Sequence, residues 1–111
     1  MIVEHGLLHV VPGREEEFEA ALAEAKRLVA AAPGFRSLRV SRGVESPSTY
    51  LLLVEWERIE DHTEGFRGSP AFTEWRRLVG GFWEPKPTVE HFRPVAEAAP
   101  PGQAALPTPG R

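Results

Sequence analysis

The chain has 111 residues, of which 41% are hydrophobic and 26% are charged, and its net charge is −3. This length suits one domain with a single core, and the composition is that of an ordinary soluble globular protein without a basic field for nucleic acid. The absence of cysteine excludes disulfides, thiolate nucleophiles, iron–sulfur clusters and thiolate zinc sites. The N-terminus has no basic n-region and no later segment is long enough to span a bilayer, so we expect a cytoplasmic protein without a membrane partner.

The first half of the chain has the pattern of a strand, a helix and two further strands. Residues 2–11 are apolar with polar interruptions, which is typical of a strand. Residues 15–32 carry acidic side chains in the first turn and an apolar stripe at helical spacing, and a Pro-Gly pair follows them, so they predict an amphipathic helix. Residues 35–44 alternate apolar and polar side chains, and residues 49–57 predict the antiparallel partner of that half-exposed strand.

The second half predicts a helical segment broken in two and a last strand. Within the preceding strand, residues 51–54 read Leu-Leu-Leu-Val, and the lack of polar alternation predicts burial on both faces. Residues 58–66 and 69–83 predict two helices separated at Gly68, the second opening with a Ser-Pro pair typical of an N-cap and a first helical position. Residues 88–95 then supply the last strand.

The resulting order, β-α-β-β-α-β, predicts an α+β ferredoxin-like sandwich with a four-stranded antiparallel sheet. Both helices would cover one face of that sheet, so we expect a second copy to cover the other face in a homodimer. Residues 1–95 form the expected domain. Residues 96–111 are an Ala- and Pro-rich tail with little to pack, and if it is ordered we expect an extended arm anchored by Leu106.

Short motifs along residues 1–95 add a family resemblance. They are Pro12-Gly13 before the first helix, Pro33-Gly34-Phe35 after it, Trp56-Glu57 at the end of the third strand, Ser69-Pro70-Ala71-Phe72 at the start of the last helix and Pro85-Lys86-Pro87 before the final strand. With these motifs the chain resembles the antibiotic biosynthesis monooxygenase (ABM) family. The resemblance implies a ferredoxin-like fold paired into a dimeric α+β barrel. It indicates function less sharply, because the family includes cofactor-independent oxygenases of aromatic polyketides, haem-degrading enzymes, quinol oxygenases and proteins of no assigned role.

The resemblance also suggests site residues. Relatives that oxidise anthrone-type polyketides contact substrate through Asn, Trp, Tyr and Arg, and by alignment those positions are Leu52, Trp56, His62 and Arg76 here, so two of four match. Haem-degrading relatives use Asn, Trp and His at positions that are Gly6, Phe66 and Arg76 here, so none of three matches. The resemblance therefore favours aromatic oxidation over haem degradation.

The chemistry of these side chains suits a reaction that needs no cofactor. Molecular oxygen accepts an electron from a carbanion or phenolate without flavin or metal, so the protein needs a base, an anion stabiliser and a dry pocket. The imidazole of His62 titrates near neutrality and can take a proton from a phenol or activated methylene, and the guanidinium of Arg76 can anchor the resulting anion. We thus expect three catalytic residues, His62, Arg76 and Trp56, and four substrate-binding residues, Leu52, Phe66, Phe72 and Phe82.

Each of these residues also has a purely structural interpretation. Trp56 ends a buried strand and suits core packing, His62 stands in an acidic stretch typical of an exposed helix, and one of Arg76 and Arg77 should be a solvated charge. Two functional classes therefore stay open: a cofactor-independent monooxygenase of a small electron-rich aromatic such as a quinol or anthrone, and a non-catalytic or stress-related dimer that binds small hydrophobic metabolites. The apolar Leu52, at a position where relatives carry Asn, favours the second class.

The remaining histidines do not predict a metal site. His5 and His9 are four residues apart on a strand, about 13 Å, which is too far to share one metal ion. His91 on the last strand could approach either of them across the sheet, where a structural histidine is the simpler interpretation.

Overall fold

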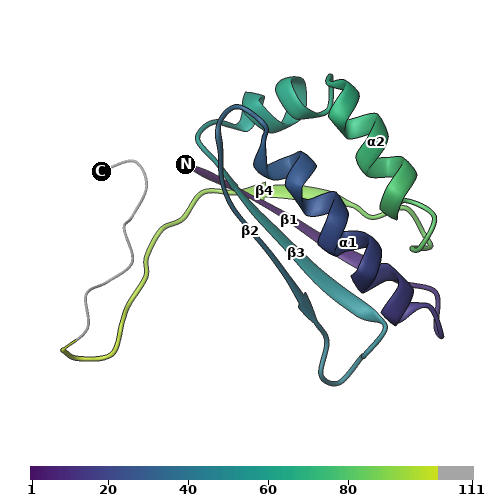
Figure 1. The fold of residues 1–111 in the computed structure, drawn as a ribbon. Coiled ribbons are helices and arrows are strands. Elements are labelled where there is room, and N and C mark those ends of the chain that lie inside the picture. The colour runs from purple at the N-terminus through teal and green to yellow at the C-terminus, as the bar shows by residue number, and fades with distance from the viewer. Residues whose placement is uncertain (103–111) are drawn as a thin grey trace.

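The computed structural model describes residues 1–102 and has the predicted order of strands and helices (Figure 1). The elements are β1 (Ile2–His9), α1 (Glu15–Ala30), β2 (Phe35–Arg42), β3 (Thr49–Trp56), the short π-helix η1 (Asp61–Phe66), α2 (Pro70–Val79) and β4 (Val89–Phe92). The strands form one antiparallel sheet in the order β2-β3-β1-β4. This is the ferredoxin-like arrangement, so the predicted fold class is confirmed.

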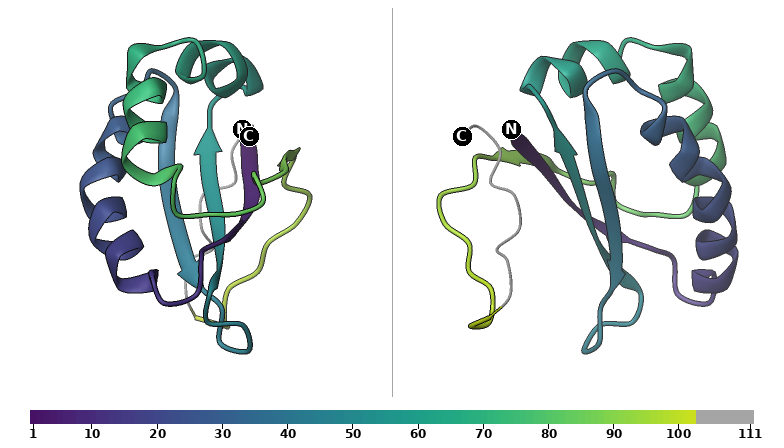
Figure 2. Two further views of the ribbon diagram at one scale, coloured as in Figure 1. Left: turned by 90° about the vertical axis from the view of Figure 1, so that its right-hand side faces the viewer. Right: turned by 60° about the vertical axis from the view of Figure 1, so that its left-hand side comes forward.

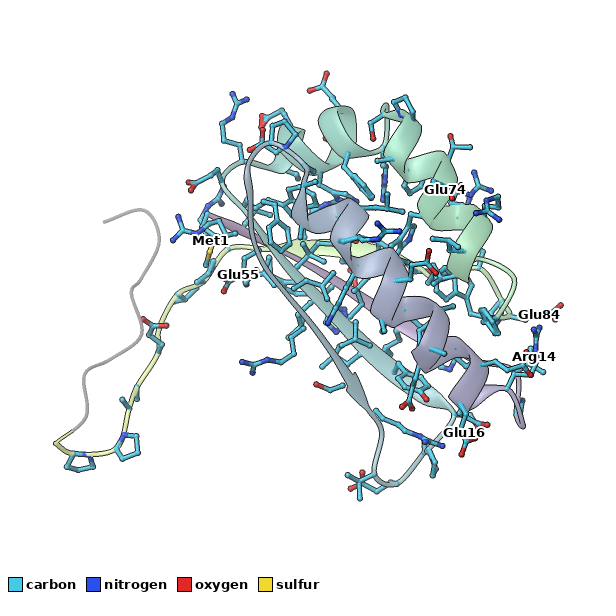
Figure 3. All side chains as sticks on the ribbon, in the orientation of Figure 1. Met1, Arg14, Glu16, Glu55, Glu74 and Glu84 are labelled. Carbon is cyan, nitrogen blue, oxygen red and sulfur yellow. The ribbon has the colours of Figure 1, made fainter. Side chains whose placement is uncertain are left out.

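Both helices lie on the same face of the sheet, and the opposite face is bare in the single chain (Figure 2). Side chains fill the space between the two layers (Figure 3). On β3 the residues Tyr50, Leu52, Val54 and Trp56 are buried under the helices, whereas the alternate residues Leu51 and Leu53 are half-buried on the bare face. The predicted burial of residues 51–54 on both faces is therefore met on one face only, because a strand alternates its side chains.

Most elements end earlier than the sequence predicts, for identifiable reasons. The strand β1 ends at His9, and Val10 instead makes an isolated bridge to Trp83. The helix α2 ends at Val79 because two glycines follow, which disfavour helix, and the Gly80 N–H closes its last turn on a backbone carbonyl. The strand β4 is short because it pairs only with the first half of β1. The expected N-cap is confirmed, since the Ser69 hydroxyl accepts from the Phe72 N–H at 3.3 Å.

The bare face of the sheet carries apolar side chains beside two histidines. Leu7 and Phe92 are 44% and 50% exposed, and the ring of His5 packs edge-on against Phe92 with 5.5 Å between centroids. His9 also lies on this face. His91, however, is paired with Glu4 and points to the helix side, so the expectation that it approaches His5 or His9 is wrong. Neighbouring residues of a strand face opposite ways, and Phe92 occupies the other side.

Beyond β4, residues 93–100 leave the sheet without regular secondary structure and run away from the body of the domain, and a turn follows at residues 101–102 (Figure 1). Val95 is 96% exposed there, so its side chain is almost fully accessible to water in the single chain. Leu106, the expected anchor of the tail, lies outside the described residues. Within residues 1–102, the helices are all too short or too polar to traverse a lipid bilayer.

Candidate functional site

A cavity of about 760 Å³ opens between the helix side of the sheet and α2. Its size is in the range of small-molecule sites. The cavity draws residues from β1, β3, η1 and α2, from the segment between α2 and β4, and from β4 itself. Much of its wall is apolar, and the apolar lining residues include Leu8, Leu52, Phe72, Trp75, Trp83 and Val89.

A buried polar network lies at the sheet side of this cavity. The carboxylate of Glu4 accepts a hydrogen bond from the Trp56 indole N–H at 3.0 Å, and the same oxygen, Oε1, is 3.4 Å from Nε2 of His62. The other ring nitrogen of His62, Nδ1, is 2.8 Å from Nε2 of His91, and which of the two donates depends on the tautomer. Four side chains from β1, β3, η1 and β4 therefore form one continuous chain of contacts, and two of them, Glu4 and His62, line the cavity.

The π-helix η1 places His62 in this network. Its wide turn is closed by a hydrogen bond from the Arg67 N–H to the His62 carbonyl at 3.0 Å, five residues apart. Within this turn His62 and Phe66 face the sheet and are buried, at 3% and 5% exposed. The indole of Trp56 stacks on the imidazole of His62, with ring centroids 5.6 Å apart and planes 17° from parallel. A local widening of the helix thus turns an imidazole out of an acidic, solvent-facing stretch and into the core.

Burial dominates the electrostatics of the network. Burial raises the pKa of Glu4, partly offset by the hydrogen bond from Trp56 and the charge of Arg67. Burial also lowers the pKa of His62 to about 4, and the positive charges of Arg67 and His91 act in the same direction. The pKa of His91 is lowered by burial and by Arg67. At neutral pH both imidazoles are therefore uncharged, so each ring carries one N–H donor and one unprotonated nitrogen that acts as an acceptor.

The rest of the cavity wall is positively charged. Arg67, Arg76, Arg77 and Lys86 line it, and Glu4 is the one acidic lining residue in the part of the chain that the structure describes. Arg77 is engaged by Glu74 through two contacts of 2.7 and 2.6 Å. The guanidinium of Arg76 lies 5.8 Å from the centroid of the Phe72 ring. A cationic wall in a protein of net charge −3 favours an anionic ligand.

The structure brings some of the sequence-predicted site residues together and not others. Leu52, His62, Phe72 and Arg76 all line the one cavity. Trp56 does not: it is 0% exposed, and its indole N–H is bound to Glu4 rather than directed at the cavity. Phe66 is packed between Trp56 and Phe72, with ring centroids at 6.0 and 5.6 Å.

Phe82 also lies away from the cavity lining. It packs on Phe18 with ring centroids 5.9 Å apart, and the Arg14 guanidinium covers it at 4.4 Å. The aromatic wall of the cavity is instead formed by Phe72, Trp75 and Trp83.

Sequence reasoning missed Glu4, His91, Arg67 and Lys86. A signal for Glu4 was present in the alternation of β1, because Glu4 lies four residues before the core-facing Leu8 and so points to the same face, where a buried carboxylate needs a partner. The position of His91 depends on the register of β4 against β1, which no local pattern fixes.

Comparison with known proteins identifies the family. Residues 1–78 match the family model described as antibiotic biosynthesis monooxygenase. The chain belongs to the ABM family. A curated relative, the uncharacterized protein YczJ of Bacillus subtilis, is 46% identical over 95 residues, which is 86% of this chain and all of that protein.

Solved structures of other ABM-like proteins share the fold. A family protein from Bordetella bronchiseptica is 40% identical, with a TM-score of 0.82 over 86% of this chain and 97% of that one. A monooxygenase from the gene ActVA-Orf6 of Streptomyces coelicolor, solved in complex with the ligand nanaomycin D, is 17% identical, with a TM-score of 0.75 over 89% of this chain and 91% of that one. At that identity the likeness is one of fold.

Proposed function

We propose that this ABM-family protein is a cofactor-independent monooxygenase of a small electron-rich aromatic substrate, such as a quinol or an anthrone. The observation that supports this most is the shared cavity: the uncharged imidazole of His62 and the guanidinium of Arg76 line one largely apolar space of about 760 Å³. A proton acceptor, a permanent cation and a low-dielectric wall are the three groups that this chemistry needs.

Atoms and electrons balance with oxygen as the only co-reactant. For an anthrone, loss of a proton from the activated CH₂ gives a carbanion, which passes one electron to O₂ and combines with the resulting superoxide as a peroxide. Return of a proton to the peroxide and loss of the second C–H proton release water and leave a carbonyl, so CH₂ and O₂ become C=O and H₂O. Arg76 stabilises the negative charge on the substrate throughout, because its guanidinium does not lose its proton.

The remaining predicted residues differ in whether they contact the substrate directly or act through another side chain. Leu52 and Phe72 contact the substrate ring directly, since both line the cavity. Trp56 acts through Glu4, whose carboxylate it holds beside His62. Phe66 supports the cavity wall from behind through its ring contact with Phe72. Phe82 packs on Phe18 and takes no part in the site. That a protein of the same fold holds nanaomycin D is consistent with an aromatic ligand.

A second candidate function is a non-catalytic or stress-related dimer that binds small hydrophobic metabolites. Leu52 favours it, because an apolar side chain in the cavity wall donates no hydrogen bond to a reacting oxygen. The same cavity would then serve for storage or removal of its ligand.

Oxygen consumption separates the two functions. The full chain is tested against 1,8-dihydroxyanthrone, 1,4-dihydroxynaphthalene and catechol, with His62→Ala and Arg76→Ala as variants. Arg27→Ala is the matched control, because Arg27 lies on α1, pairs with Glu24 and does not line the cavity. We expect turnover that falls about 100-fold in His62→Ala and in Arg76→Ala but not in the control. Equal turnover in all variants would refute the site, and binding without oxygen consumption would favour the second function.

A further inference from the structure

We propose that Glu4, His62 and His91 form a proton relay, which takes the proton from the substrate in the cavity, holds it on His91 while oxygen reacts, and returns it to the peroxide. The relay rests on the proposed oxygenase function and adds two residues to it. Glu4 is the group that touches the substrate, and His91 is the group that stores the proton away from it.

The contacts of Glu4 leave one oxygen for the substrate. Oε1 is occupied by Trp56 and faces His62, whereas no hydrogen bond within residues 1–102 engages Oε2. Every fully buried side-chain oxygen in the described part of the chain has a hydrogen-bond partner. Because Oε2 has none, it is not fully buried, and because Glu4 lines the cavity, Oε2 is accessible from the cavity. A carboxylate oxygen facing a cavity that holds an acidic hydroxyl or methylene is positioned to accept its proton.

The two imidazoles continue the path away from the cavity. Both nitrogens of His62 face another titratable group, Nε2 at 3.4 Å from Glu4 and Nδ1 at 2.8 Å from His91. The longer step needs a shift of about 0.5 Å to reach ordinary hydrogen-bond length. The proton that Oε2 accepts reaches Nε2 of His62 when the carboxyl group of Glu4 turns about its Cγ–Cδ bond, which brings that oxygen to the position of Oε1. A proton that Nε2 then receives is matched by one that Nδ1 gives to Nε2 of His91, so His62 changes tautomer and stays uncharged. His91 is half-buried at the edge strand β4 and does not line the cavity.

Holding the proton matters because the overall reaction neither takes up nor releases one. The first step removes a proton from the substrate and a later step returns one to the peroxide. If the proton stayed beside the carbanion, it would return to carbon before oxygen reacted. Transfer of the proton through Glu4 and His62 to His91 keeps the positive charge away from the carbanion until oxygen has reacted.

The positive charge of Arg67 opposes the storage of a proton on the relay. Its charge acts on Glu4, His62 and His91, and on each it lowers the pKa. The groups facing His62 are Glu4 from β1, Trp56 from β3, His91 from β4 and Arg67 from the end of η1. Among these groups only Glu4 is acidic, so a stored proton is disfavoured until the cavity holds an anion that balances it.

The test follows the proton without requiring turnover. The full-length protein is mixed with 1,8-dihydroxyanthrone under anaerobic conditions, at a pH where the free compound is uncharged. Absorbance of the bound compound reports its ionisation, and ¹⁵N NMR of the histidine side chains reports which ring carries the proton. The variants are Glu4→Gln, which keeps an acceptor for the Trp56 N–H, and His91→Gln. His9→Gln on the bare face of the sheet is the control.

We expect the wild type and His9→Gln to bind the anthrone as its anion with His91 protonated, and both relay variants to lower the anion fraction about tenfold or more. With oxygen present, kcat should fall about 100-fold in Glu4→Gln. If Glu4→Gln does not fold, His91→Gln decides alone.

Two other outcomes separate the relay from the proposed function. Equal ionisation in the wild type and both relay variants, together with turnover, would overturn the relay and leave the oxygenase standing. Failure of the wild type to bind or oxidise any of the three aromatics would overturn both.

Discussion

Nδ1 of His62 lies 2.8 Å from Nε2 of His91, although 29 residues separate them in sequence. This contact joins η1 to the edge strand β4 across the end of the sheet, and Glu4 on β1 completes it from the neighbouring strand. Three ionisable groups from three elements are thus in contact with one another. The arrangement is costly, because none of the three is well hydrated, and such costs are typical of functional sites.

The stability of the fold should depend on pH through His62. The folded protein holds its pKa at about 4, below the ordinary 6.5, so the unfolded chain binds this proton more readily. The free energy of unfolding should therefore fall as the pH falls from 6.5 towards 4, by up to about 3 kcal/mol. His91 acts in the same direction, and Glu4, whose pKa is raised, acts in the opposite one.

Urea unfolding at several pH values between 7 and 4 measures this dependence. His62→Gln should flatten the slope, and His9→Gln should leave it as in the wild type. An unchanged slope in His62→Gln would show that His62 is not a buried neutral imidazole.

The cationic cavity wall should select aromatic anions. Calorimetry without oxygen can compare 1,4-dihydroxy-2-naphthoate with 1,4-dihydroxynaphthalene, which differ by one carboxylate. We expect the carboxylate to bind about fivefold more tightly in dilute salt and to lose most of that advantage at about 1 M salt. Arg67→Gln and Lys86→Gln should each reduce the preference, and Lys26→Gln on α1 should not. A preference that is independent of salt would contradict this prediction.

Gly34 should be required for the position of η1. Its φ of +84° suits glycine, and a Cβ atom there would overlap the carboxyl group of Asp61, the first residue of η1. Gly13 has a similar φ of +93° with open space around it. Gly13→Ala should therefore cost about 1 kcal/mol of unfolding free energy for backbone conformation alone, and Gly34→Ala about 2 kcal/mol or more. Thermal and urea unfolding would measure both, and equal losses would mean that the overlap is relieved freely.

The bare face of the sheet should pair with a second copy. Leu7, Leu51, Leu53 and Phe92 lie on it, and an apolar sheet face is stable in water only when covered. Sedimentation equilibrium at micromolar concentration should give a dimer for the wild type and a monomer for Leu51→Glu or Leu53→Glu. Val44→Glu in the loop between β2 and β3 is the control, since Val44 is already 88% exposed. A monomeric wild type would rule out this pairing.

The fold could be predicted because its signals are local. The acidic first turn and apolar stripe of α1, the Ser69 N-cap of α2 and the apolar alternation of the strands each lie within a few residues of one another. The ends of the elements were less certain, since β4 pairs with only four residues of β1, from Val3 to Gly6, and no local pattern sets that length.

The site could be predicted only in part. His62 lines the cavity, but its sequence neighbours Glu60, Asp61 and Glu64 gave it the pattern of an exposed helix, and only the π-helical turn buries it. Trp56 was expected at the cavity wall and lies behind it, because the side chain that reaches the wall from β1 is Glu4. Which strands lie side by side is decided by the whole sheet, not by any one segment.

The four residues of β4 serve both faces of the sheet at once. His91 points inward to His62, while Phe92 and Glu90 project to the opposite side, against the surface where a twin molecule would dock. An edge strand this short has few hydrogen bonds of its own to keep it in place. Binding of a second copy would hold β4 in place. Dilution or mild denaturant that separates the two copies should therefore abolish the proposed oxygenase activity while each copy is still folded.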